Sequence, residues 1–303
     1  MKINRLISFA VIFFMMVITA TANAALKPFV LASMESASQQ DVVASTKSKL
    51  TAAGFDVVGE YSPYDTVTII AVTNDVLKTG AAETKFGAFG AVQRVTVTQG
   101  KDGVQVGYTN PIYYSKAYRM KADMSGVADQ LAKALGKQKD YGSEKGKSAE
   151  QLGDYHYKWL MPYVHDRLEL AEYGGHSMAV KAVEEAVTTG KGAVAKVYRV
   201  DIPGQEATVF GVNMKGTDAD DCSGDKYIMD RIDFKDLKSS GHLPYEIVVV
   251  GNKAYALPAE FRIAISFPDL SMMGDHSFAS IMCAPSAIQE SLTLGAGGEI
   301  SDE

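Results

Sequence analysis

The chain has 303 residues, of which 47% are hydrophobic and 22% charged, and it carries 30 basic and 36 acidic side chains. The formal net charge is therefore −6. Proteins that bind nucleic acid usually have a basic excess or a concentrated basic stripe. Neither is present in this sequence, nor is a basic stretch typical of proteins that bind anionic membranes. Both classes are therefore set aside.

Residues 1–24 have the pattern of a signal peptide. Lys2 and Arg5 precede an apolar run over residues 6–20, and the motif ANA at 22–24 supplies the small residues that a signal peptidase recognises. A membrane-spanning helix needs about 20 apolar residues, so this run is short for a permanent anchor. The sequence predicts an exported protein, periplasmic or secreted, with no stable membrane insertion after cleavage.

The elements predicted over residues 29–136 form one α+β unit. Residues 29–63 read as a strand, a polar turn, an amphipathic helix that stops at glycine, and a second strand. An apolar strand is predicted at 67–73. A hairpin at 93–111 ends at a proline, which cannot donate a ladder hydrogen bond. A helix at 127–136, ending on glycine, closes the unit.

The same order of elements recurs, more loosely, in the second part of the chain. Residues 168–203 repeat the strand, helix and strand, and an apolar strand is predicted at 207–213. A hairpin at 245–268, with a longer outgoing arm that runs to a proline, is followed by a helix at 286–295. An insert at 214–242 has no counterpart of equal length in the first unit, and it is a candidate surface for contact with another protein.

The stretches GFDVVGEY at 54–61 and VQVGYTNP at 104–111 carry a resemblance to a known family. With the preceding helix and the apolar strand between them, they resemble the bacterial domain-of-unknown-function family numbered three hundred and two. The resemblance covers 26–136 clearly and 168–295 more loosely. It implies a small α+β fold that commonly pairs as a dimer, and it implies no activity or catalytic residue.

We therefore predict an α+β protein with two similar repeats, each a small antiparallel or mixed sheet with packed helices. Because the family commonly forms dimers, a tandem copy implies that the two repeats are arranged as an intramolecular pseudo-dimer. The predicted segments are a signal peptide, a first repeat, a connector with an aromatic segment, and a second repeat with the insert, over residues 1–24, 25–140, 141–166 and 167–303.

The connector holds the most unusual stretch, YHYKWLMPYVHD at residues 155–166. On a helix, its aromatic residues at spacings of four would share one face. One interpretation is that these rings fill the groove between the repeats, since tyrosine and tryptophan suit half-buried interfaces. The other is a site for a small, partly apolar ligand held between the repeats. The residues that would line such a site are Tyr155, His156, Trp159, Met161 and Tyr163.

The second interpretation makes the protein an exported binding or accessory protein without established catalysis, with a small molecule or another periplasmic protein as its partner. The alternative is a haem- or metal-linked periplasmic redox accessory protein. In that case His156 or His165 would be an axial haem ligand with Met161 opposite, as histidine and methionine often are. A copper ion would instead use a patch of thioether and imidazole groups, at Met272, Met273 and His276.

Catalytic motifs are not recognisable in the sequence, which leaves the question of an enzyme open and favours a protein without catalysis. Arg94, Arg119 and Arg262 are candidates to clamp a carboxylate-bearing ligand, or else are charges at strand edges or form pairs at the interface between the repeats. The acidic loop at 218–225 does not match the spacing of an EF-hand, and it is predicted to be solvated.

Cys222 and Cys283 are the two cysteines of the chain. In an oxidising compartment a structural disulfide between them is the default, with two unpaired thiols as the alternative.

Overall fold

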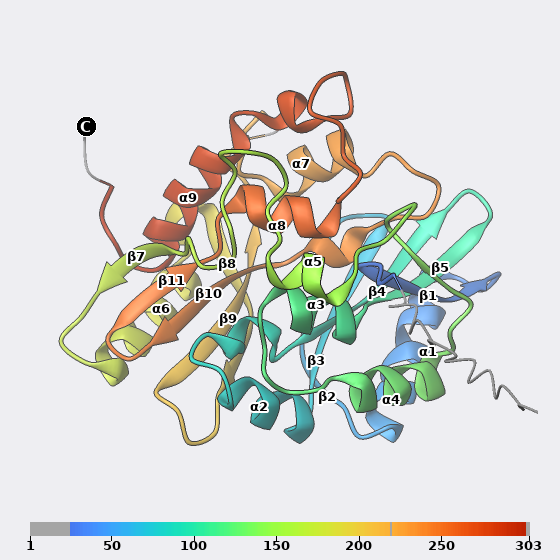
Figure 1. Cartoon of the computed structure of the whole chain (residues 1–303), viewed down its shortest axis with the longest axis horizontal. Helices are drawn as coiled ribbons and strands as arrows, with labels where there is room; N and C mark the ends of the chain where they lie inside the picture. The colour runs from blue at the N-terminus through green and yellow to red at the C-terminus, as the bar shows by residue number, and fades with distance from the viewer. Residues whose placement is uncertain (1–24, 219, 301–303) are drawn as a thin grey trace, which may run out of the picture.

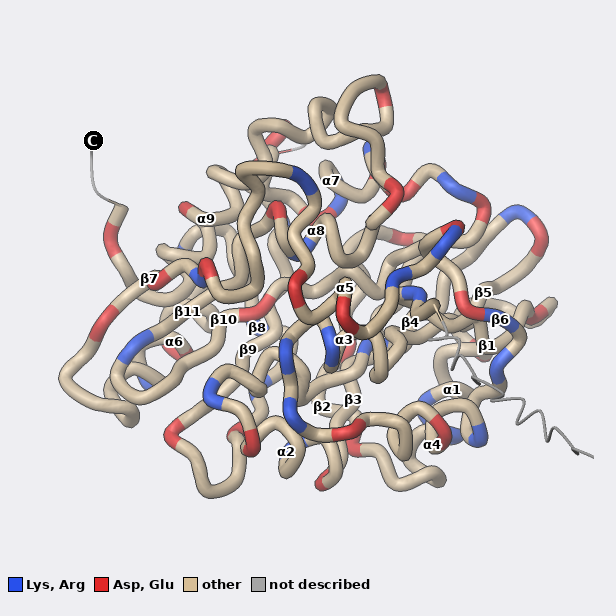
Figure 2. Tube along the Cα trace, viewed as in Figure 1, with Lys and Arg blue, Asp and Glu red and all other residues tan. Residues whose placement is uncertain are grey.

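The computed structural model describes residues 25–218 and 220–300. The predicted signal peptide at 1–24 lies outside the described residues. The described chain folds into two antiparallel sheets covered by helices, which confirms the predicted α+β class. In Figure 1 the five-stranded sheet lies on the left and the six-stranded sheet on the right. Figure 2 shows acidic and basic positions interspersed along the whole trace.

The first sheet has the strand order β2-β3-β4-β5-β1-β6. Helices α1 and α4 pack against each other and against strands of this sheet, and Val42 and Leu50 of α1 are buried there. The strands are β1 (Phe29–Glu35), β2 (Asp56–Tyr64), β3 (Val67–Thr73), β4 (Gln93–Gly100), β5 (Gly103–Thr109) and β6 (Lys139–Tyr141). The helices are α1 (Gln39–Ala52), α2 (Asp75–Ala82), α3 (Pro111–Ala117), α4 (Ser125–Leu135) and α5 (Ala149–Gly153), with a short 3-10 helix, η1 (Gly87–Gly90).

The second sheet has the order β7-β11-β10-β9-β8, and helices α6 and α9 pack on it and on each other. Its strands are β7 (Leu168–Glu172), β8 (Val194–Asp201), β9 (Ala207–Met214), β10 (Tyr245–Val250) and β11 (Lys253–Ala256). The helices are α6 (His176–Thr189), α7 (Asp225–Ile232), α8 (Ala259–Ser266) and α9 (Ala284–Gly295). Three 3-10 helices complete this part: η2 (Lys191–Ala193), η3 (Ser240–His242) and η4 (Phe278–Ile281).

Most of the helices and strands predicted from the sequence are present at the expected residues, but the outgoing arm of the second hairpin differs. Strands β3 and β9 confirm the apolar strands predicted at 67–73 and 207–213. The outgoing arm of the second hairpin was predicted to run to Pro268, but the strand ends at Ala256 and helix α8 follows. Nearly every residue of α8 is buried, so its sequence shows no polar face by which a helix could be distinguished from a buried strand.

The two halves of the chain, residues 25–166 and 167–300, pack against each other through short helices and strands. Helix η1 of the first half contacts β9 and β10, and η3 of the second half contacts β3, β4 and β5. Strand β2 also packs against β8, where a Cβ atom on Gly59 would lie 2.4 Å from the carbonyl oxygen of Val197. Glycine is therefore required at this approach of two backbones. Among the helices of the described residues, none is long and apolar enough to cross a membrane.

Candidate functional site

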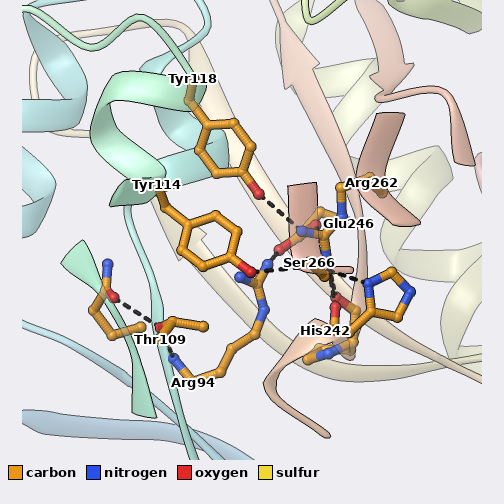
Figure 3. Close-up of polar contacts among 10 residues, drawn as sticks. Arg94, Thr109, Tyr114, Tyr118, His242, Glu246, Arg262 and Ser266 are labelled. Carbon is orange, nitrogen blue, oxygen red and sulfur yellow. Dashed lines mark hydrogen bonds and ion pairs between the residues drawn. The ribbon is translucent and has the colours of Figure 1, made fainter. Parts of the chain in front are cut away.

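A buried ionic centre lies between the two halves (Figure 3). Arg94 of β4 and Arg262 of α8 both form ion pairs with Glu246 of β10, at 3.3 Å in the case of Arg262. The side chains of all three residues are no more than 2% exposed. Buried charges are costly unless a group of opposite charge lies beside them. Here Glu246 is that group for both arginines. A ligand cannot reach them, which favours interface pairing over a carboxylate clamp at Arg94 and Arg262.

Tyrosine and histidine side chains complete this centre. In Figure 3, Tyr118, at the C-terminal end of α3, points toward Arg262. Tyr114 of α3 points toward Arg94 and Ser266, and its hydroxyl lies 3.2 Å from that of Ser266. Arg262 donates to the Tyr118 hydroxyl at 2.8 Å, and its other Nη donates to the carbonyl of His242 at 2.7 Å. Burial and the neighbouring arginine charges hold the pKa of His242 well below its usual value, so this imidazole is neutral. The centre is a structural connection between the halves.

A separate cleft of about 470 Å³ opens between the halves. Its first wall comes from Lys27 and residues 139–144, around strand β6. The opposite wall comes from residues 232–239, which begin at the last residue of α7, and from the loop after α8 at 267–276. The apolar surface is supplied by aromatic and aliphatic side chains, among them Tyr141, Ile232, Phe234, Leu237, Phe267 and Leu270. A ligand site typically has this composition, with apolar walls and a few polar groups.

Hydrogen bonds across the two halves hold a segment that contributes to the cleft wall. The side-chain amide of Gln105 on β5 donates to the carbonyl of Lys238 at 2.9 Å and accepts from its amide nitrogen at 2.9 Å. The hydroxyl of Tyr141 donates to the same carbonyl at 2.9 Å. Gln105 is 2% exposed. These bonds fix residues 237–239 against the first sheet without filling the cleft.

The loop after α8 is fastened on both sides of the cleft. The carboxylate of Asp269 accepts from the main-chain amide of Glu144 at 2.6 Å and from the Ser143 hydroxyl at 3.2 Å. At its far end, His276 bonds to the carbonyl of Arg231 at 2.7 Å and stacks on Phe234, with ring centres 4.5 Å apart. Phe234 is 49% exposed, so this pair of rings lies at the rim.

Asp233 is a buried carboxyl in the wall of the cleft. Both of its oxygens accept from the main-chain amide of Ser239, at 2.9 and 3.0 Å. Burial raises the pKa of Asp233 to about 7, although the bonds from Ser239 and the charge of Lys238 act in the opposite direction. At neutral pH this carboxyl therefore carries only part of a negative charge.

The connector residues proposed as a ligand site do not form a helix. Leu160 has a positive φ of 69°, and Pro162 follows it, so a regular helix cannot continue through this stretch. Tyr155 is buried, and its hydroxyl donates to the carbonyl of Ala264 at 3.1 Å. Trp159, in contrast, is 83% exposed. The expectation of one aromatic face that fills the groove between the repeats is therefore wrong for this ring.

The remaining connector residues lie at the surface. Met161 and Tyr163 are half-buried and line an open surface groove together with His156 and Trp159. Tyr163 stacks on His156 on one side, at 4.4 Å between ring centres, and on His165 on the other, at 5.1 Å. The neighbouring Tyr157 hydroxyl bonds to the carbonyl of Leu270, which connects this segment to a wall of the cleft.

Among the described residues, no group of three or more His, Cys, Asp or Glu side chains is arranged to hold a metal ion. His156 bonds through Nδ1 to the carbonyl of Lys158 at 2.9 Å. In the methionine-rich loop considered for copper, Met272 and Met273 are 41% and 75% exposed, and the Nδ1 atom of His276 is engaged with Arg231.

Arg119 pairs at the surface with Asp154, at 3.2 Å.

Cys222 and Cys283 form a disulfide, with their Cα atoms 5.9 Å apart. The bond fastens the insert, just before α7, to the beginning of α9. The acidic loop beside it is organised by the carboxylate of Asp221. Although partial burial raises the pKa of this carboxyl, hydrogen bonds from Ser223 and Thr217 outweigh that effect and lower it to about 2. These bonds hold Asp221 to Thr217 and Ser223.

No family model matches this chain, and no curated protein or solved structure matches it either. The geometry of the chain itself is therefore the basis for a functional proposal.

Proposed function

We propose that this chain is an exported binding or accessory protein that holds a small, partly apolar ligand between its two halves, without catalysis. The observation that carries the proposal is the cleft of about 470 Å³ whose walls come from both halves. Sites for small molecules have volumes of about 300–1,000 Å³ and often lie where two domains meet. The proposed site is this cleft, and the connector residues 155–163 support one of its walls.

The arrangement of the halves as an intramolecular pseudo-dimer is part of the same proposal. The first five strands of one sheet, β2-β3-β4-β5-β1, correspond in order along the chain to β8-β9-β10-β11-β7 of the other. Arg94 pairs across its sheet with Ala71, and Glu246 pairs with Gly211 at the corresponding place. The two charges that meet at the centre would then be related by the pseudo-symmetry. Membership of the family suggested by residues 54–61 and 104–111 stays a prediction.

Export rests on two observations. The leader pattern at 1–24 is one of them, and the disulfide between Cys222 and Cys283 is the other. Disulfides persist in oxidising compartments and are rare in the cytosol. We therefore propose a periplasmic or secreted location.

The experiment is a fluorescence titration of the mature protein with phenylnaphthylamine, an uncharged aromatic probe that becomes bright in apolar surroundings. Leu237 is half-buried in the cleft wall, so Leu237→Trp fills the cleft and should weaken binding at least about tenfold, the cost of about 1.4 kcal/mol. The control Val76→Trp adds the same ring on α2, at a side chain that is 53% exposed. It should leave the affinity unchanged.

A second variant covers the case in which the larger ring prevents folding. Phe234→Ala removes a half-exposed ring at the rim, which should weaken probe binding about threefold to tenfold through the lost aromatic contact. Far-UV circular dichroism reports whether each variant is folded. If folded Leu237→Trp and Phe234→Ala bind the probe as tightly as the wild type does, the proposed site is wrong.

A further inference from the structure

Three lysine side chains surround the proposed ligand cleft. Lys139 and Lys235 are exposed on opposite walls, and Lys27 is half-exposed beside β6. Within residues 25–218 and 220–300, none of these ammonium groups has a carboxylate within ion-pair distance. The cleft therefore has positive charge at its rim that the protein does not neutralise by direct pairing.

The acidic groups of the cleft differ in how they are bound. Asp140 forms an ion pair with Lys137 at 3.0 Å, and Lys137 does not line the cleft. Asp269 accepts two hydrogen bonds, from Ser143 and from the amide of Glu144. The carboxylate of Glu144 itself is exposed, and neither it nor Asp269 has an ion pair among the described residues, so these two acids oppose the lysines.

Asp233 adds only part of a negative charge at neutral pH. Its carboxyl is buried in the wall and accepts two hydrogen bonds from Ser239, and at neutral pH it is only partly ionised. In the described part of the chain, three ammonium groups without an ion pair therefore face two carboxylates without one, those of Glu144 and Asp269, around an apolar interior. A ligand that matches this distribution has an anionic group at one end and an apolar body.

We propose that the ligand of this cleft is a small organic acid, with its carboxylate or sulfonate at the lysine rim and its apolar body between Tyr141 and Leu237. The inference rests on the proposed function and adds the charge of the ligand to it. Apolar burial would supply most of the affinity, because ammonium groups in contact with water contribute modestly and are screened by salt. The lysines would select anions over neutral molecules of the same shape.

The test compares two probes that share one aromatic scaffold. Anilinonaphthalenesulfonate carries a sulfonate, and phenylnaphthylamine is uncharged. Lys139→Gln combined with Lys235→Gln should weaken binding of the sulfonate about threefold to tenfold, the range expected for two partly exposed charge contacts, and change binding of the neutral probe less than about twofold. Added sodium chloride should weaken binding of the sulfonate alone.

The control is Lys181→Gln combined with Lys191→Gln, at exposed positions on α6 and η2, which changes the net charge equally. It should leave both affinities unchanged. If the cleft lysine variant weakens both probes equally, or neither, the assignment of an organic acid is overturned while the cleft stands. If the wild type binds neither probe, or if Leu237→Trp leaves both affinities unchanged, the proposed function fails together with this inference.

Discussion

Replacing Glu246 should destabilise the protein more than replacing any carboxylate at the surface. In Glu246→Gln, two buried guanidinium groups lose their counter-charge. Arg262 keeps the Tyr118 hydroxyl and two main-chain carbonyls as partners, but Glu246 is the partner of Arg94 at this centre. Breaking a buried pair by removing one partner costs about 3–5 kcal/mol of the free energy of unfolding. The loss should lie in that range, because both arginines are at least 98% buried.

A double-mutant cycle separates the pair from its surroundings. Arg94→Met combined with Glu246→Leu replaces both charges of one pair by apolar side chains, and it should lose less stability than the sum of the two single variants. Arg262 stays buried in the double variant, with the Tyr118 hydroxyl and two main-chain carbonyls as its partners. Urea unfolding followed by far-UV circular dichroism is the assay, because the exposed Trp159 is a poor reporter of unfolding. Glu60→Gln, which breaks an exposed pair with Lys47, is the control and should cost less than about 1 kcal/mol. The reasoning would be refuted if Glu246→Gln lowered the free energy of unfolding no more than the control does. It would also be refuted if the loss in the double variant equalled the sum of the losses in the two single variants.

Three further predictions concern pH, the disulfide and the connector. Burial raises the pKa of Asp225 to about 8, above the value of about 3.9 in an unfolded chain, so its contribution to stability is full below about pH 4 and is lost as the pH rises toward 8. Asp225→Asn should therefore raise the free energy of unfolding at about pH 8 and flatten its decline from about pH 5; a decline as steep as the wild type's contradicts this assignment. Replacing both Cys222 and Cys283 by serine should cost about 4 kcal/mol in urea unfolding, since they close a loop with a sequence separation of 61, and a loss below about 1 kcal/mol would show that the loop is held by other contacts. Because the Trp159 ring is 83% exposed, Trp159→Ala should change the free energy of unfolding by less than about 0.5 kcal/mol and leave the affinity for phenylnaphthylamine unchanged. A tenfold loss of affinity would instead place the ligand at the connector.

The elements with a clear period were predictable from the sequence, and those without one were not. Strand β3 and helix α1 have bounds close to those expected, because an apolar run and an amphipathic stripe each indicate one kind of element. Helix α8 was not predicted, because nearly all of its residues are buried and its sequence therefore has no polar face with a helical period. Helix α7 lies within the insert, where the comparison between the two parts of the chain gave no guide.

In the connector, a regular spacing of aromatic residues suggested a helical face that the structure does not contain. The spacing of Tyr155, Trp159 and Tyr163 would align three rings on a helix, but the stretch before Pro162 is too short to form a helix without tertiary support. The structure separates the rings, with Tyr155 buried and Trp159 exposed. The packing interpretation therefore holds for Tyr155 and fails for Trp159, and the ligand site at the connector stays a prediction.

The cleft could not be predicted because its walls are distant in sequence. Residues 139–144, 232–239 and 267–276 meet only after the second half folds over the first. Ordinary residues such as Leu237 and Lys139 have no motif that marks them as a site. Similarly, Arg94 and Arg262 stood out as charges near apolar strands, but the sequence gave no sign that Glu246 would lie between them.

A crystal structure of the mature protein in complex with phenylnaphthylamine tests the central claim most directly. The account predicts the naphthyl ring in the cleft between the halves, in contact with Tyr141 and Leu237, with residues 155–163 free of ligand. A ring bound instead against Trp159 and Tyr163, or anywhere outside the cleft, would contradict the proposed site.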